Sequence, residues 1–206
     1  MHDLITATAQ IERQGWRRLL VISGEPAWCA QQAADVMAQL PGDWLWAGKP
    51  EGTGLCCEPQ AIRTLLGREF HHAVFDARDG FHAEAFAALA GTLRAGSWLL
   101  LLVPEWDGWA QRPDADSLRW SEADTPCAST HFVHHVQQSV LADPRVVLWR
   151  QPFPRTFSPV AIRPDWQVDN RAQQDILTQL LNAPPGIYAV SYTHLRAHEP
   201  RSKVVC

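Results

Sequence analysis

A short turn early in the chain carries the first residues that could bind a ligand. Ser23, Gly24 and Glu25 follow the apolar segment 17–22, and Pro26 suits the first turn of a helix. Open α/β sheets bind ligands outside the carboxyl ends of their strands, and a helix N-terminus attracts anions. The turn holds one glycine and neither a GxGxxG nor a Walker A pattern. It therefore fits either a nucleotide contact or a plain tight turn in which Glu25 complements the helix dipole.

Asp76 is the second candidate, because it ends a predicted strand over residues 70–76. A carboxylate in that place can hold Mg²⁺ through water beside a nucleotide. It can equally cap the following turn or pair with Arg78. Together with Ser23 and Gly24, Asp76 defines one hypothesis, a free-standing nucleotide-binding α/β enzyme that uses this edge of the sheet.

A cysteine and several histidines suggest a different kind of site, a zinc centre. Cys127 precedes a predicted helix over 131–141, on which His131 and His135 are i,i+4 neighbours. No CxxC or HExxH pattern supplies a second pair of ligands. Helical spacing predicts that the histidines lie in solvent, because another side of this helix forms the buried stripe Phe132, Val133, Val136 and Val140.

The long irregular segment 104–126 is rich in tryptophan, aspartate and proline. Tryptophan rings in a loop can stack on unpaired bases, and arginines can contact phosphates. The same rings can simply anchor the loop. We take four residues of this segment as candidate RNA contacts: Trp106, Arg112, Arg119 and Trp120.

The order of predicted elements favours an α/β fold. Strands are expected at residues 17–23, 43–47, 70–76, 97–103 and 145–150, and helices at 3–15, 26–40, 59–66, 83–94, 131–141 and 171–182. Strands that alternate with helices form a mostly parallel sheet with helices on both faces. We therefore expect a three-layer, doubly wound sheet of five strands, flavodoxin- or Rossmann-like, with a flavodoxin-like strand order as the working hypothesis.

Composition indicates a globular protein, with 46% hydrophobic and 19% charged residues and a net charge of -4. An acidic domain is a poor partner for nucleic acid as a whole, so any RNA contact must be a local patch. The five cysteines show no disulfide framework, which favours the reduced cytoplasm. The longest apolar run, 98–103, is too short to span a membrane, and the N-terminus lacks a signal-peptide pattern.

The last quarter of the chain differs from the rest. Residues 151–170 contain four prolines without periodicity and are predicted to be a linker, and 171–182 is an amphipathic helix. A turn and a short strand follow up to Val190. Residues 191–206 have no helical or strand periodicity and resemble a translated adapter or vector tail, so we exclude them. The predicted domains are therefore 1–150, a linker at 151–170, the start of another module at 171–190, and a non-native tail.

Several stretches carry a family resemblance: RRLLVISGE (17–25), LPGDWLW (40–46), TLLGREFHHAVFDARDGF (64–81), AFAALAGTLRAGSWLLLLVPEW (85–106), PDADSLRW (113–120), THFV (130–133) and the PPG turn at 184–186. The chain resembles the N-terminal region of bacterial tRNA(Met) cytidine acetyltransferase, the TmcA family. The resemblance implies a larger enzyme that also contains a helicase-like ATPase module and an acetyltransferase module. Such an enzyme uses acetyl-CoA and ATP with Mg²⁺ to form N4-acetylcytidine at the wobble position of elongator tRNA-Met.

The resemblance also implies what this chain does not carry. In the family, the strand at Ala189-Val190 would run into a glycine-rich phosphate loop with its lysine, and this sequence departs at Ser191. Gln173 matches a glutamine that contacts ATP in the intact enzyme; an amide can both donate to and accept from the adenine edge. We expect an accessory domain that positions tRNA or packs on the ATPase module, in a cytoplasmic protein without membrane contact. We expect no catalytic residue, metal or cofactor in the fragment itself.

Overall fold

The computed structural model describes residues 2–49, 55–155, 171–184 and 186 of the 206-residue chain. The chain divides into two compact units, Met1–Ile162 and Arg163–Cys206. The second unit contains α5 (Arg171–Asn182), with the limits predicted for this helix. Most of the predicted linker and the whole predicted tail, residues 191–206, lie outside the described residues, so the predicted domain boundaries stay a prediction.

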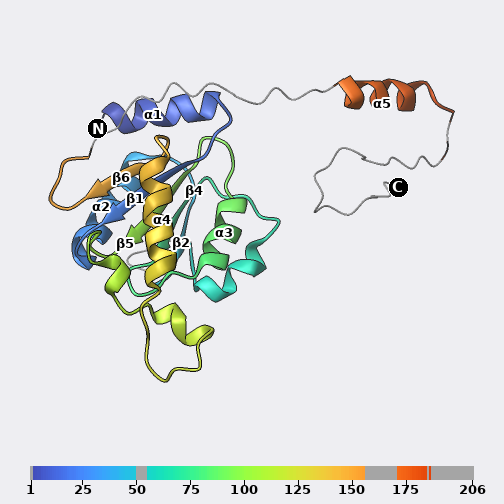
Figure 1. Cartoon of the computed structure of the whole chain (residues 1–206). Helices are drawn as coiled ribbons and strands as arrows, with labels where there is room; N and C mark the ends of the chain where they lie inside the picture. Colours follow the sequence, from blue (N-terminus) through green and yellow to red (C-terminus); the bar gives the residue numbers. More distant parts are fainter. Residues whose placement is uncertain (1, 50–54, 156–170, 185, 187–206) are drawn as a thin grey trace. The chain divides into compact units, whose positions relative to one another are not determined.

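The first unit is built on one parallel sheet, which confirms the predicted α/β class (Figure 1). All of its strand pairs are parallel, and the order is β3-β2-β4-β5-β1-β6. The strands are β1 (Arg18–Ser23), β2 (Trp44–Ala47), β3 (Leu55–Cys57), β4 (His72–Asp76), β5 (Trp98–Val103) and β6 (Val147–Arg150).

Helices cover both faces of this sheet, as a doubly wound fold requires. On one face α1 (His2–Arg13) and α2 (Pro26–Gln39) pack against side chains such as Leu20 and Leu100. The other face is covered by three elements and by the loop beside them. These elements are the 3₁₀ helix η1 (Pro59–Leu65), α3 (Ala83–Gly91) and α4 (Thr130–Ala142). The loop contains two short 3₁₀ helices, η2 (Trp109–Gln111) and η3 (Ala115–Arg119).

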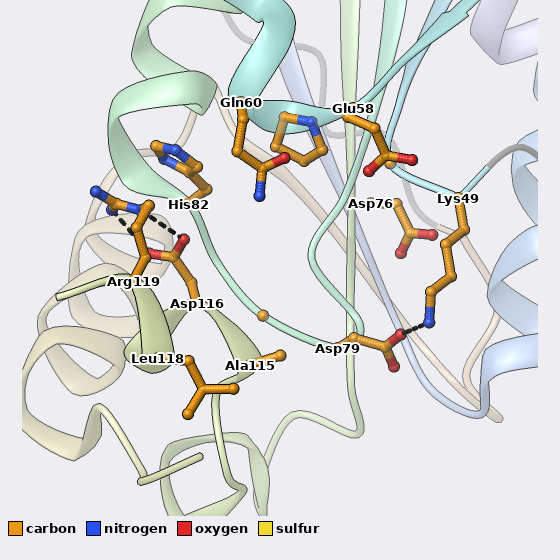
Figure 2. A pocket seen from close by; sticks show the side chains of 13 residues that line it. Lys49, Glu58, Gln60, Asp76, Asp79, His82, Ala115, Asp116, Leu118 and Arg119 are labelled. Carbon is orange, nitrogen blue, oxygen red and sulfur yellow. Dashed lines mark hydrogen bonds and ion pairs between the residues drawn. The ribbon is translucent and has the colours of Figure 1, made fainter. Parts of the chain in front are cut away.

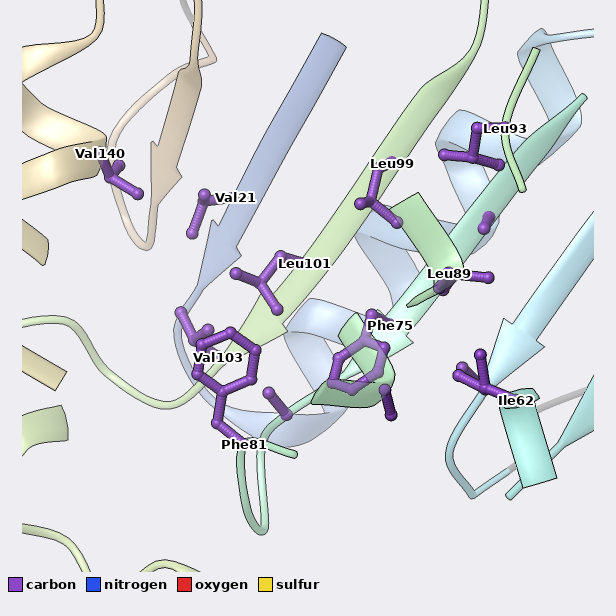
Figure 3. Packing of buried hydrophobic residues seen from close by; sticks show 14 of the residues in the cluster. Val21, Ile62, Phe75, Phe81, Leu89, Leu93, Leu99, Leu101, Val103 and Val140 are labelled. Atoms are coloured by element: carbon purple, nitrogen blue, oxygen red, sulfur yellow. The ribbon is translucent and has the colours of Figure 1, made fainter. Parts of the chain in front are cut away.

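The central strand β5 shows why the two layers form. All six of its residues, WLLLLV, are buried, because they alternate between two apolar faces. Leu99, Leu101 and Val103 belong to the core under α3 and α4, part of which Figure 3 shows. Trp98, Leu100 and Leu102 belong to the core under α1 and α2.

Two details of the sheet differ from the expectation. Among the described residues it has six strands rather than five, because residues 55–57, where no strand was predicted, form the short edge strand β3. The flavodoxin-like order is wrong. The connection from β1 through α2 passes over β5 and β4 before the chain returns as β2, and β1 lies between β5 and β6.

This topology fixes where a ligand site would be expected. From β1 the chain passes to the face covered by α2, whereas from the neighbouring β5 it passes toward the face covered by α4. Such a reversal opens a crevice at the carboxyl ends of the two strands in many α/β proteins. Ser23 and Val103 end these strands, so the predicted turn stands at the switch point. Among the described residues, no helix is both long and apolar enough to cross a bilayer.

Candidate functional site

The turn after β1 is tied to the neighbouring strand by its own hydrogen bonds. Ser23 is 1% exposed, and its hydroxyl donates to the carbonyl of Pro104 over 2.7 Å. The backbone N–H of Gly24 donates to the carbonyl of Val103. The Ser23 side chain therefore holds the ends of β1 and β5 together and does not face a cavity.

Gln151 packs against this turn and bonds to its backbone at the start of α2. Its side-chain oxygen accepts a hydrogen bond from the backbone N–H of Glu25, 2.8 Å away, at the N-terminus of α2. A Cβ atom on Gly24 would lie 2.6 Å from the same oxygen and 2.8 Å from the Cβ of Gln151. The glycine is therefore needed for the close approach of Gln151, and these contacts favour the structural role of a tight turn.

Asp76 is likewise engaged within the protein. Its carboxylate accepts two hydrogen bonds from the Arg78 guanidinium, at 2.8 and 2.7 Å, and both side chains are under a tenth exposed. Arg78 also donates to the carbonyl of Pro26 in the first turn of α2. A buried carboxylate in a two-bond pair with arginine is a structural anchor, and removing one partner of such a pair typically costs about 3–5 kcal/mol. In this structure both elements of the alternative nucleotide site make contacts within the protein, and the nucleotide site stays a prediction.

A cavity of about 500 Å³ does open beside this edge, near the ends of β2 and β4 (Figure 2). Four of its ionic side chains form two pairs across the wall, and Glu58 and Asp76 also line it. Lys49 lies 2.5 Å from the Asp79 carboxylate, and Arg119 makes two 2.9 Å bonds to Asp116. These hydrogen bonds raise the pKa values of Lys49 and Arg119. His82, also in the wall, accepts the N–H of Ala85 with Nδ1 and so caps α3. Among the described residues that line it, the wall presents these two ion pairs, the Glu58 carboxylate and no serine or cysteine beside a base.

The zinc hypothesis finds no support in the part of the chain that is described. Cys127, His131 and His135 are all exposed, and no group of three histidine, cysteine, aspartate or glutamate residues there could hold a metal ion. The histidines lie on the solvated side of α4, as predicted. The prediction of the buried stripe is only partly correct: Val133 and Val140 are buried, but Phe132 is 40% exposed.

The four predicted RNA contacts do not share one environment. Trp106 is 5% exposed and packs against Trp109, with 6.0 Å between the ring centroids. Its ring is therefore a loop anchor and cannot stack on a base, which corrects the prediction for this residue. Trp120 is 56% exposed at the end of η3, and Arg112 and Arg119 are also exposed. These three remain candidates.

Asp114 organises this loop, a role that the sequence reasoning missed. One carboxylate oxygen accepts the N–H groups of Phe81 and Asp116, at 3.1 and 2.9 Å, and the other accepts the Ser129 hydroxyl at 3.0 Å. The side chain is buried between the turn after β4 and the start of α4. An aspartate that follows a proline and precedes a short helical turn was the available signal.

Gln173 lies in the first turn of α5. Its side chain lies outside the described residues, so its proposed contact with adenine stays a prediction.

Comparison with known proteins identifies the family. The profile described as "tRNA(Met) cytidine acetyltransferase TmcA, N-terminal" matches residues 1–151. The chain belongs to the TmcA family. The match contains the whole sheet, β1 to β6, together with Gln151, the residue that fills the switch point.

Curated TmcA proteins agree with this assignment. The chain is 49% identical over 196 residues to "tRNA(Met) cytidine acetyltransferase TmcA" of Pectobacterium atrosepticum and 50% identical over 196 residues to that of Yersinia pestis. These alignments cover 93% and 92% of this chain and 28% of each relative. The Haemophilus influenzae protein is 36% identical over 127 residues, with 60% of this chain and 19% of the relative covered. The chain thus spans just over a quarter of the length of the first two TmcA relatives.

Proposed function

We propose that this chain is the N-terminal part of a tRNA(Met) cytidine acetyltransferase. The support is the family match over residues 1–151 together with relatives that share about half of their aligned residues. The family resemblance implies the reaction of the whole enzyme, formation of N4-acetylcytidine at the wobble position of elongator tRNA-Met from acetyl-CoA with ATP and Mg²⁺. In that enzyme, Gln173 would contact ATP, and the protein would work in the cytoplasm.

Within that enzyme, we assign the domain of residues 1–150 a non-catalytic, accessory role. One observation carries this assignment: the switch point of the sheet is filled by the protein itself. Gln151 accepts a hydrogen bond from the Glu25 N–H at the start of α2, and Arg78 donates a hydrogen bond to each carboxylate oxygen of Asp76. A parallel sheet whose ligand position is closed in this way serves as a scaffold, and the chemistry belongs to the other modules.

The tRNA contact that best fits the geometry is the exposed end of η3. Trp120 offers a ring that is more than half exposed, and Arg112 and Arg119 lie in the same loop. Arg119 already pairs with Asp116, which reduces the local positive charge. We therefore expect base stacking by Trp120 to contribute more than phosphate attraction, at about 1–3 kcal/mol per stacked base.

The test uses the full-length enzyme that contains this sequence and elongator tRNA-Met carrying a photoreactive base. Crosslinked peptides are expected to include residues 112–120, and Trp120→Ala should weaken tRNA binding by about 5-fold or more. Leu118→Ala is the matched control, since Leu118 is 47% exposed in the same short helix.

Two results would count against the proposal. Crosslinks confined to other modules, with equal tRNA affinity for the Trp120→Ala enzyme, would remove the RNA contact from this domain. A full-length protein that binds tRNA-Met yet forms no acetylcytidine with acetyl-CoA and ATP would overturn the assignment to the acetyltransferase.

A further inference from the structure

An apolar groove lies between α3 and α4, on the face of the sheet away from α1 and α2. It encloses about 330 Å³. Leu101, Phe81 and Val140 form its buried floor, while Leu19, Phe86 and Phe132 form more accessible walls. Figure 3 labels these three floor residues within the buried cluster. The groove lies over β1 and β5, where Leu19 of β1 is half-buried and every residue of β5 is buried.

Phenylalanine rings continue from the core into the wall of this groove. Phe75 is fully buried and contacts Phe81 and Phe86 edge-on, with centroid distances of 6.0 and 5.4 Å. Phe81 in turn lies 5.6 Å from the ring of Phe132. Phe132 is 40% exposed, so the outermost ring of a core cluster faces solvent. Burying it against an apolar surface would gain about 25 cal/mol for each Å² removed from water.

The polar groups in the wall leave little to orient a small ligand. The Ser139 hydroxyl donates to the carbonyl of His135 within α4. The Asp143 carboxylate accepts two hydrogen bonds from the Arg145 guanidinium, and this pairing lowers the pKa of Asp143. Small-molecule sites usually combine an apolar wall with a few convergent polar groups. This groove has the wall, and the hydroxyl of Ser139 and the carboxylate of Asp143 are already bonded, which leaves the His135 imidazole as the remaining polar side chain among the described lining residues.

We propose that this groove is the docking site for an apolar segment from the part of the full-length enzyme that follows this chain. The inference rests on the proposed function, because it requires the chain to be one part of a longer protein. The first two relatives extend to more than three times the aligned length, since the alignment covers 28% of them. A second copy of this chain is less suited to the groove, because each copy carries a net charge of -4 and would repel the other.

The occupant should present aliphatic or aromatic side chains at helical spacing, because the groove is bounded by two helices and lined by carbon. An interface between domains of one chain is of this kind, with an apolar centre and a polar border. Its role would be to hold the accessory domain in a fixed orientation relative to the remaining modules.

Cysteine labelling on α4 tests the docking. Ser139→Cys places a thiol in the groove, whereas Gln138→Cys places one on the exposed side of α4, outside the groove. Labelling by a maleimide, measured by peptide mass spectrometry, separates these positions from the native cysteines. In the full-length enzyme, position 139 should react at least 10-fold more slowly than in the 206-residue chain, and position 138 should react equally in both.

Phe132→Glu in the full-length enzyme should restore fast labelling at position 139. Leu141→Glu, on the same helix and 66% exposed, should leave the protection unchanged. Equal labelling of position 139 in both proteins would overturn the proposal, as would protection in the 206-residue chain that grows with its concentration, the sign of self-association. Labelling does not depend on tRNA or acetylation, so a failure of the proposed function and a failure of docking give different results.

Discussion

His72 is the residue whose burial has the clearest measurable consequence. It is fully buried, its Nδ1 accepts the backbone N–H of Trp98 at 3.0 Å, and its ring stacks on those of Trp44 and His71. Burial, and next the neighbouring His71, lower its pKa from 6.5 to about 4. The sequence predicted a strand at 70–76 but gave no sign of which of its two adjacent histidines points inward, because both faces of this strand are apolar.

The lowered pKa predicts acid sensitivity. His72 protonates less readily in the folded than in the unfolded state. Above pH 6.5 it is neutral in both states and does not reduce the free energy of unfolding, whereas between pH 6.5 and 4 only the unfolded state gains the proton, so stability is lost as the pH falls. By pH 4.5, His72 should account for a loss of about 2–3 kcal/mol in the free energy of unfolding. Urea unfolding at pH 7 and pH 4.5 measures this loss.

His72→Phe keeps a stacked ring without the titrating group. It should be less stable than wild type at pH 7, because the Trp98 N–H loses its acceptor, but it should lose less stability on acidification. His131→Phe, at an exposed position of α4, should retain the wild-type dependence. An equal acid-induced loss in wild type and His72→Phe would show that His72 is not the cause.

At the scale of elements, the parts that were predictable are those with long apolar runs. The segments 17–23 and 97–103 became β1 and β5 because continuous apolar residues suit strands buried on both faces. The edge strand β3 has three residues and is largely exposed, so it left no pattern. Residues 59–66 kept the predicted helical character but formed the 3₁₀ helix η1. Strand order was not readable, since nothing local specifies how many strands α2 crosses.

The contact between the β1 turn and the end of β6 gives a prediction at this scale. Gly24→Ala should destabilise the domain by about 1–3 kcal/mol, because the added methyl group would collide with Gln151 and with the Trp28 ring, 2.9 Å away. Gln151→Ala alone should cost about 1 kcal/mol through the lost hydrogen bond to Glu25.

The double variant Gly24→Ala/Gln151→Ala tests whether the methyl group added at position 24 collides with the Gln151 side chain. It should be more stable than the sum of the two single losses requires, by more than 0.5 kcal/mol, because Gln151→Ala removes the side-chain oxygen that makes the shortest contact with the added methyl group. The contacts with the Cβ of residue 151 and with the Trp28 ring remain, so only part of the loss is recovered. Thermal or urea unfolding of the four proteins completes the cycle. Strict additivity would mean that Gln151 does not fill this space in solution.

At the scale of the whole molecule, long matching sequence stretches were enough to assign the family. The roles of the candidate site residues, in contrast, could be judged only once the fold showed which residues they contact. The sequence placed Ser23-Gly24-Glu25 and Asp76 at the ligand-binding edge of a parallel sheet and left their roles open. Only the fold brings Gln151, 126 residues further along the chain, into contact with Glu25. It likewise shows that Trp106 is buried, which tryptophan content alone could not reveal.

Because Gln151 bonds to Glu25 and Arg78 bonds to Asp76 at the carboxyl edge of the sheet, we expect that the 206-residue chain does not bind nucleotide tightly. Isothermal titration with ATP and Mg²⁺ should give no heat beyond dilution, because a single hydrogen bond, such as one from Gln173, contributes only about 1 kcal/mol. The full-length enzyme, for which the proposed function expects ATP binding, is measured under the same conditions for comparison. Micromolar binding of ATP by the 206-residue chain would show that these contacts do not exclude a nucleotide, and it would contradict the accessory role.

The partnership of Glu25 with Gln151 also has a consequence during synthesis. Glu25 is synthesised long before Gln151, its hydrogen-bond partner. On the ribosome, the start of α2 therefore stays exposed to water until residue 151 has left the exit tunnel. Ribosome-bound chains whose residue 151 is still inside the tunnel should be more sensitive to protease around Gly24 than longer chains from which residue 151 has emerged.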